Sequence, residues 1–246
     1  LLLKISRPEK LYNRIFGIVS PHAGYVYSGK TAAYVYNLLK DKTYKTVIVI
    51  SPSHAEYFPG ISIYDGDAYE TPLGIVEIDN EMTDKIVENS KIIFRGIQGH
   101  RKEHALEVQI PFLQSVLKDF KIVPIVMGDQ SKMFVDHLAE KISEVVDEET
   151  LVVASSDMSH FYDSEEANRL DSIVEKRIND FDFEQLLKDL DDHECEACGG
   201  GPIAAMMKAA SLKNITKSMV INRSDSGDVT GDKSEVVGYL SAVVYD

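Results

Sequence analysis

Short, uninterrupted runs of apolar and β-branched residues constrain the fold of this chain more than any other sequence feature. Four of them lie at residues 14–20, 46–51, 121–126 and 151–155. A strand with one solvated face alternates in polarity, whereas a strand buried on both faces reads as a continuous apolar run. The runs therefore predict strands of a parallel sheet that is covered by helices on both sides.

Segments with apolar residues at helical spacing separate these strands. They span residues 28–39, 79–89, 105–117, 132–146, 164–179, 183–190 and 202–212. Towards the C-terminal end, residues 218–222 and 234–245 predict two strands that pair with each other. This order predicts an α/β fold with a central, largely parallel or mixed sheet flanked by helices on both faces.

Two polar or turn-rich segments interrupt this pattern. Residues 53–73, rich in aromatic residues, Gly and Pro, predict a long loop or a small hairpin over the sheet edge. Residues 224–233 predict a polar loop. Neither segment has the composition of a linker, and 246 residues fit one large α/β domain. We therefore expect a single domain over residues 1–246.

The acidic charge balance restricts the classes of partner. Lys plus Arg number 26 and Asp plus Glu number 40, which gives a net charge of -14. Nucleic-acid binding relies on clustered cations that neutralise phosphates, and an anionic membrane surface would repel such a chain. We therefore expect neither nucleic-acid binding nor membrane binding.

The sequence also bears on localisation. Its apolar runs are too short to span a bilayer. The opening residues Leu1, Leu2 and Leu3 lack the cationic start and the longer apolar stretch of a secretory signal peptide. These features predict a cytoplasmic protein.

Small polar residues and a histidine follow three of the predicted strands. His22 follows the first strand, His54 the second, and His160 a later one that ends near Ser155. The carboxyl ends of parallel strands share one edge of a sheet, and ligands bind in the crevice there. Each histidine alone is more simply a hydrogen-bonded structural residue, but three at such positions favour a common site.

Metal binding is the chemistry that this pattern favours. Imidazole is the commonest side-chain ligand for Zn, Cu, Fe and Ni, and two His with one anionic ligand form a recurring reactive-metal arrangement. The candidates for the anionic ligand are Cys198, Glu194, Glu196 and Asp157.

The two cysteines of the chain form a C-x-x-C motif, Cys195 and Cys198. This motif fits a redox dithiol, part of a metal site, or two buried apolar side chains. A zinc ribbon would need a second such pair, and a thioredoxin-type motif would follow a first strand early in the domain. The redox interpretation is therefore weak.

His104 and Glu107 lie three residues apart at the start of the helix predicted over residues 105–117. Residues at this spacing share a helix face, so both side chains could point into the cleft. The alternative is a helix N-terminus at which Glu103 complements the dipole. The other three histidines are expected at the surface: His100, His137 and His193.

Two motifs of well-known enzyme classes do not occur in the sequence. A G-x-S-x-G elbow is absent, which argues against an α/β-hydrolase. A G-x-G-x-x-G pattern is absent as well, so the dinucleotide-binding fingerprint has no support.

Five short motifs occur in a fixed order along nearly the whole chain. They are Ser20-Pro21-His22-Ala23-Gly24-Tyr25, Ser51-Pro52-Ser53-His54, Glu103-His104 with Glu107 and Pro111, Ser155-Ser156-Asp157 with His160, and Cys198 followed by Pro202-Ile203. In this order they resemble the Memo-like family, whose prokaryotic members are also called AmmeMemoRadiSam system protein B.

The resemblance implies a fold and a set of site residues. The family is similar in fold to class III extradiol dioxygenases, which hold non-haem iron with two His and one Glu. By resemblance, His22 and His54 take the two His positions and Cys198 takes the third. His160 matches the acid-base His of the dioxygenases, and Asp157 lies beside it in the same motif. The implied cofactor is one metal ion, with iron favoured over copper and zinc.

Three function classes follow from these residues and the resemblance. The first is a non-haem metal oxidoreductase with dioxygenase-like chemistry, which acts with a radical-SAM partner protein, as the prokaryotic family name implies. The second is a non-catalytic scaffold that binds a peptide or protein in the old dioxygenase cleft. The third is a metal-assisted hydrolase with zinc-bound water as the nucleophile. The ligand would be a small molecule or a peptide.

Overall fold

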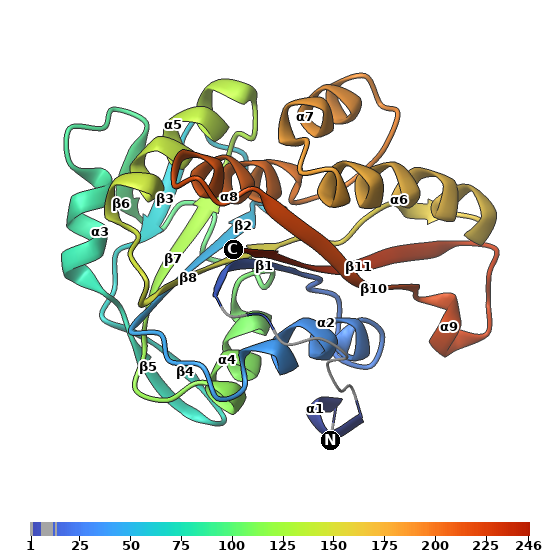
Figure 1. The fold of residues 1–246 in the computed structure, drawn as a ribbon, viewed down its shortest axis with the longest axis horizontal. Coiled ribbons are helices and arrows are strands. Elements are labelled where there is room, and N and C mark those ends of the chain that lie inside the picture. The colour runs from blue at the N-terminus through green and yellow to red at the C-terminus, as the bar shows by residue number, and fades with distance from the viewer. Residues whose placement is uncertain (1, 6–11, 13) are drawn as a thin grey trace.

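A nine-stranded mixed sheet crosses the centre of the molecule (Figure 1). The computed structural model describes residues 2–5, 12 and 14–246. The strands of this sheet are β1 (Ile15–Ser20), β2 (Thr46–Pro52), β3 (Ile61–Tyr64), β6 (Ile93–Gly96), β7 (Lys121–Met127), β8 (Thr150–Ser155), β9 (His160–Tyr162), β10 (Lys217–Asp225) and β11 (Val236–Tyr245). A separate hairpin consists of β4 (Ala68–Thr71) and β5 (Gly74–Glu77).

Parallel pairs form the middle of the sheet. The strand order is β10-β11-β1-β8-β2-β7-β3-β6, and β9 pairs with β11 outside this path. β8 lies between β1 and β2 and is parallel to both, and β7 is parallel to β2. All residues of β1, β2 and β8 are buried, as their continuous apolar runs predict. The predicted α/β fold with a mixed sheet is confirmed.

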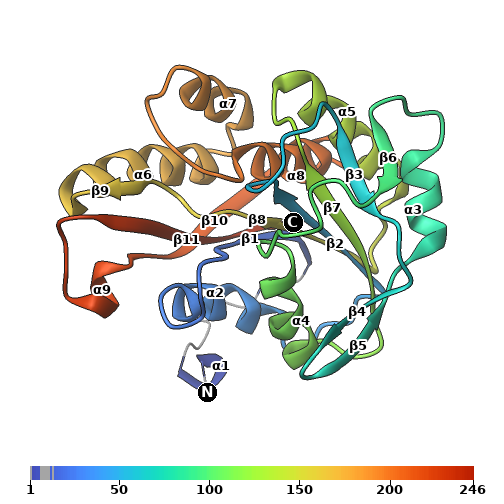
Figure 2. The same ribbon diagram turned by 180° about the vertical axis from the view of Figure 1, so that it is seen from behind.

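Helices cover both faces of the sheet, as Figures 1 and 2 show. They are α1 (Leu2–Ile5), α2 (Gly29–Tyr36), α3 (Asn80–Val87), α4 (Ile110–Val116), α5 (Lys132–Val145), α6 (Ser164–Asn179), α7 (Phe183–Asp191), α8 (Gly200–Leu212) and α9 (Gly227–Thr230), with 3-10 turns η1 (Asn37–Leu39) and η2 (Glu107–Gln109). Successive side chains of a strand point to opposite faces. In β2, Ile48 and Ile50 pack in the core with α5 and α8, whereas Val47 and Val49 pack in the core with α2 and α4.

The elements that the sequence did not predict are short. β3 lies within the segment expected to be a loop or hairpin, and β6 follows α3. Each has four residues, too few for a periodic pattern to stand out from its surroundings. The polar loop predicted over residues 224–233 contains the single turn of α9. Within the described residues, every helix is too short or too polar to cross a bilayer.

The two predicted C-terminal strands do pair with each other. β10 and β11 are antiparallel, and β11 also pairs with β1. The C-terminal strand is therefore inserted beside the first strand of the sheet rather than added at its edge.

Candidate metal centre

The carboxyl ends of β1, β8 and β2 lie side by side because these three strands are neighbours in the sheet. His22 follows the end of β1 in the sequence, and His54 follows the end of β2. Their ring centroids are 5.2 Å apart. The convergence expected from the strand ends is therefore present for these two imidazoles.

Cys198 reaches the same point from the connection between α7 and α8. At the next residue, Gly199, an added Cβ would lie 2.2 Å from the carbonyl oxygen of Ser155 at the end of β8. A glycine is therefore required there, because only a residue without a side chain lets this connection pack on the strand end. One ligand atom from each of His22, His54 and Cys198 lies within 4.8 Å of the other two.

A single hydroxyl fixes the tautomer of His22. The Ser155 hydroxyl donates its only proton to the carbonyl oxygen of Ala105 at 2.6 Å. Its oxygen must therefore accept its other hydrogen bonds, from Gln109 Nε2 at 2.8 Å and from His22 Nδ1 at 2.9 Å. His22 thus carries its proton on Nδ1, which leaves the lone pair of Nε2 free for a metal ion.

Gln109 is itself held in one orientation. Tyr36 donates its phenolic proton to Gln109 Oε1 at 2.7 Å. Gln109 Nε2 donates to the carbonyl oxygen of Pro21 at 3.1 Å, and a carbonyl can only accept. The amide nitrogen therefore faces Ser155, and this buried chain of hydrogen bonds ends on His22.

A buried carboxylate orients the second imidazole. His54 Nδ1 lies 3.1 Å from both oxygens of Glu103, and the backbone N–H of His54 donates to the same carboxylate at 2.6 Å. The backbone N–H groups of His104 and Ala105 donate to it at 3.0 and 2.9 Å. Although burial opposes ionisation, hydrogen bonds from His54 and Ala105 lower the pKa of Glu103 to about 2. The ionised carboxylate accepts Nδ1–H, so His54 also leaves Nε2 free.

The two imidazoles differ in their affinity for a proton. Burial, assisted by the neighbouring His54, lowers the pKa of His22 to about 3. The hydrogen bond to Glu103 raises the pKa of His54 above its usual value. His22 is therefore neutral at physiological pH. At pH values below the pKa of His54, a metal ion must displace a proton from the His54 ring in order to bind.

The sulfur of Cys198 lies against both the His22 ring and the loop after β8. Sγ is 3.3 Å from His22 Nε2 and accepts the backbone N–H of Asp157 at 3.2 Å. Burial, and then the charge of Asp157, raises the pKa of this thiol to about 12. Without a metal the sulfur is protonated and can donate to the free lone pair of His22. A metal ion bound here would take the place of that proton.

Asp157 adds a buried carboxylate beside these atoms. Its Oδ1 accepts the backbone N–H groups of His22 and Ala23 at 2.8 and 3.4 Å, and its Oδ2 lies 3.8 Å from His22 Nε2. Burial raises the pKa of Asp157 to about 6. Because His22 is neutral, the two do not form an ion pair, and above that pKa the carboxylate favours a cation at this position.

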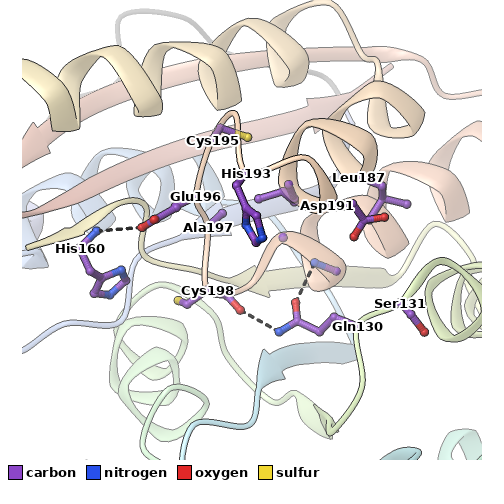
Figure 3. Close-up of a pocket in the computed structure, with 13 residues that line it drawn as sticks. Gln130, Ser131, His160, Leu187, Asp191, His193, Cys195, Glu196, Ala197 and Cys198 are labelled. Atoms are coloured by element: carbon purple, nitrogen blue, oxygen red, sulfur yellow. Dashed lines mark hydrogen bonds between the residues drawn. The ribbon is translucent and has the colours of Figure 1, made fainter. Parts of the chain in front are cut away.

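His160 is half-buried in β9, next to the ligand group but outside it among the described residues. Its backbone N–H donates to one oxygen of Glu196 at 3.4 Å, and Tyr162 donates to the other at 2.6 Å. Figure 3 shows His160 and Cys198 among the residues that line one cavity. The third histidine of the sequence pattern therefore lies beside the centre.

The helix predicted over residues 105–117 begins later than expected, because the 3-10 turn η2 precedes α4. His104 lies before this turn and Glu107 within it, and both side chains are exposed. The prediction that they share a helix face was therefore wrong. The alternative, in which Glu103 complements a helix dipole, also differs from the structure, because Glu103 orients His54. Its place beside His104 in one motif was the available signal.

The candidate anionic ligands, and the two cysteines of the C-x-x-C motif, differ in their surroundings. Cys198 belongs to the ligand group of the described residues, whereas Glu194 is exposed and Glu196 is bound by β9. Cys195 is buried in the core, and burial raises its pKa to about 12. Both cysteines are free thiols, so the motif divides into one core residue and one ligand candidate.

Two of the remaining histidines, His100 and His137, are less exposed than expected. His100 is half-buried, with its ring nitrogens 3.3 Å from the carbonyl oxygen of Ser62 and 3.4 Å from the hydroxyl of Tyr69. Burial lowers the pKa of His100 to about 4. His137 is half-buried, and His193 is exposed as predicted but lines the cavity of Figure 3.

Known proteins similar to this chain match it over most of its length. A family model described as Memo-like protein matches residues 2–243. A MEMO1 family protein from Thermoplasma volcanium is 39% identical over 228 residues, covering 92% of this chain and 84% of that protein. A MEMO1 family protein from Nitrosopumilus maritimus is 37% identical over 227 residues, covering 92% of this chain and 82% of that protein. An uncharacterized protein from Escherichia coli K12 is similar in fold, with a TM-score of 0.62 and 15% identity, covering 94% of this chain and 100% of that one.

Proposed function

Because the chain belongs to the Memo-like protein family, we propose that it binds one metal ion through His22, His54 and Cys198. The observation that supports this proposal is the orientation of the donor atoms. Both imidazoles have Nδ1 engaged by acceptors of the protein and leave Nε2 free, and the three ligand atoms lie within 4.8 Å of one another. Such partners behind the ligands are typical of protein metal sites.

The donor set favours some ions over others. A thiolate is a softer ligand than a carboxylate, so it favours iron, Cu(I) or zinc over magnesium and calcium. Iron is the ion that we favour, with copper or zinc as the alternatives. When bound, the ion would supply Lewis acidity and, as iron or copper, one-electron chemistry.

In this proposal the protein is a metal-dependent oxidoreductase with dioxygenase-like chemistry. His160 would take or give a proton at a substrate atom, since it lines the cavity beside Cys198 while its backbone is held by Glu196. Asp157 would keep a negative charge next to the ligand atoms. The ring of His22 would be held still by the hydroxyl behind it.

A specific observation supports the alternative of peptide or protein binding without turnover. The loop after His22 exposes three large side chains, Tyr25 at 43%, Val26 at 75% and Tyr27 at 45%, and Tyr57 after His54 is 76% exposed. Exposed apolar groups beside a cleft are typical of interaction sites. Saturable peptide binding that survives loss of the metal ligands would favour this alternative.

Metal content distinguishes the two cysteines. We expect anaerobically purified wild-type protein to hold close to one equivalent of metal, and Cys198→Ala to hold far less, since the site loses its anionic ligand. Cys195→Ala is the matched control from the same motif, and it should retain the metal because its side chain lies in the core. Elemental analysis of the three proteins is the measurement. Full occupancy in Cys198→Ala would exclude the sulfur as a ligand.

A second variant separates acid-base chemistry from metal binding. His160→Ala should keep the metal, because it lies outside the ligand group, and should lose any oxygen-dependent turnover, because general acid-base groups contribute about 100- to 10,000-fold to rates. Oxygen consumption with candidate substrates, measured beside metal content, is the test. Loss of metal from this variant would instead make His160 a ligand.

A further inference from the structure

A cavity of about 500 Å³ lies beside the candidate metal centre. Cys198 and His160 line it, whereas His22 and His54 do not. Its other walls come from α7, from the connection between α7 and α8, and from the segment between β7 and α5 (Figure 3). Cavities of this size hold small organic ligands, and this one reaches the centre from the sulfur side.

One part of the lining is aliphatic. Leu187 and Leu190 of α7 and Ala197 of the following connection face the cavity. Burying a methylene group against such side chains contributes about 0.8 kcal/mol. This wall therefore favours a ligand with a short hydrocarbon chain.

The polar part of the lining consists mainly of hydrogen-bond acceptors. Asp191 and Glu196 contribute carboxylates, and Figure 3 shows the imidazole of His193 between Asp191 and Cys198 in this view. A carboxylate can only accept hydrogen bonds, and a neutral imidazole offers one acceptor nitrogen. A ligand that donates several hydrogen bonds would therefore find partners here.

An anionic ligand would find no comparable partners in the cavity. None of the described residues that line it is Lys or Arg. The amide of Gln130 is used at both ends, since it donates to the carbonyl oxygen of Cys198 and accepts the backbone N–H of Gly201, each at 2.8 Å. The N–H groups at the start of α8 are thus partly occupied by the protein itself.

We propose that this cavity binds an organic amine with a short aliphatic chain. The ammonium group lies at the Asp191 carboxylate, the hydrocarbon packs on the leucines of α7, and the far end of the ligand reaches Cys198 and His160, on the side of the cavity where Glu196 is already bonded to β9. That such an amine is the substrate rests on the proposed metal-dependent function, whereas its binding to the cavity does not.

The test must separate the cavity from the general acidity of the chain, whose net charge is -14. Asp191 and Asp192 are adjacent and both exposed, but only Asp191 lines the cavity. Asp191→Asn and Asp192→Asn therefore change the net charge equally and differ only in position. Both lie on the surface, so both variants should fold.

The experiment compares n-hexylamine, hexanoate and 1-hexanol by calorimetry and ligand-observed NMR, at pH 8 and near-physiological salt. Hexylamine should bind most tightly. Asp191→Asn should lower the affinity for hexylamine about three- to fivefold, as expected for the loss of a solvent-accessible ion pair worth about 1 kcal/mol. Asp192→Asn should leave that affinity unchanged. Equal or tighter binding of hexanoate, equal effects of the two variants, or no saturable binding of hexylamine would overturn the proposal.

Measurement of each protein with and without zinc keeps the two proposals apart. Amine binding that persists in His54→Ala, whose side chain does not line the cavity, while metal binding is lost would support the cavity alone. If the protein binds one equivalent of metal but no amine, this inference is contradicted, whereas the proposal of a metal centre stands.

Discussion

Metal affinity is expected to rise about tenfold for each pH unit between pH 7.5 and 9, and Cys198→Ala should remove most of this dependence. The pKa of the Cys198 thiol is raised to about 12, so the metal-free protein carries a proton on sulfur throughout this range. Metal binding requires the thiolate and releases that proton. The advantage of the wild type over the variant should therefore widen about tenfold with each pH unit.

The other groups of the site fix the direction of the effect at lower pH. His22, with a pKa near 3, and Glu103, with a pKa near 2, do not change protonation above pH 5. His54 has a raised pKa and Asp157 a pKa of about 6, so both take up protons as the pH falls. A metal ion must displace the proton of His54, and it binds more tightly when Asp157 is ionised. Metal affinity should therefore fall more steeply with decreasing pH below neutrality than above it.

Competition with a chromophoric chelator, corrected for the chelator's own protonation, would measure this slope with zinc or cobalt under anaerobic conditions. Cys195→Ala is the control and should keep the wild-type slope, since its thiol lies in the core. A wild-type affinity that does not change between pH 7.5 and 9 would mean that no thiol proton is released, and would contradict the role given to Cys198.

Glu103→Gln is expected to weaken metal binding about 10- to 100-fold, the usual cost of losing the partner behind a ligand His. The Glu103 carboxylate accepts N–H groups from His54, His104 and Ala105, including the imidazole Nδ1–H. The amide of glutamine has one acceptor oxygen and turns a donor towards one or more of these N–H groups. The His54 ring then loses its fixed tautomer and orientation.

The matched control for this variant is Glu107→Gln, the same substitution a few residues later on an exposed side chain. It should leave metal affinity unchanged, because Glu103 and not Glu107 contacts His54. Thermal unfolding of both metal-free variants should show a loss of about 1–3 kcal/mol for Glu103→Gln alone, because its buried N–H partners lose an ionised acceptor. Equal metal affinities for the two variants would rule out the orienting role of Glu103.

The parts of the site that the sequence predicted depend on topology that a strand pattern can reveal. His22 and His54 directly follow continuous apolar strands, so a parallel sheet brings them to one edge whatever the details of packing. The resemblance to the Memo-like family supplied Cys198, since the residues alone left four anionic candidates open.

The residues that position the ligands could not be predicted in the same way. Ser155 is hydrogen-bonded to His22, and Gln109 donates to Ser155. These bonds join segments far apart in the sequence and depend on side-chain packing rather than on periodicity. The late start of α4 has a local cause, because the Glu103 side chain accepts the backbone N–H groups of His104 and Ala105 and so competes with a regular helix there.

The insertion of β11 beside β1 has a consequence for how the centre comes into being during synthesis. Both imidazoles belong to the first quarter of the chain, but the sulfur is made much later, and β1 gains its second neighbour only when the final strand arrives. Until Cys198 has been made, the chain offers an ion two nitrogens at most, and until β11 docks, β1 is unpaired on one side. Under the proposed function, bound metal would therefore mark a chain in which both the Cys198 connection and β11 have taken their places.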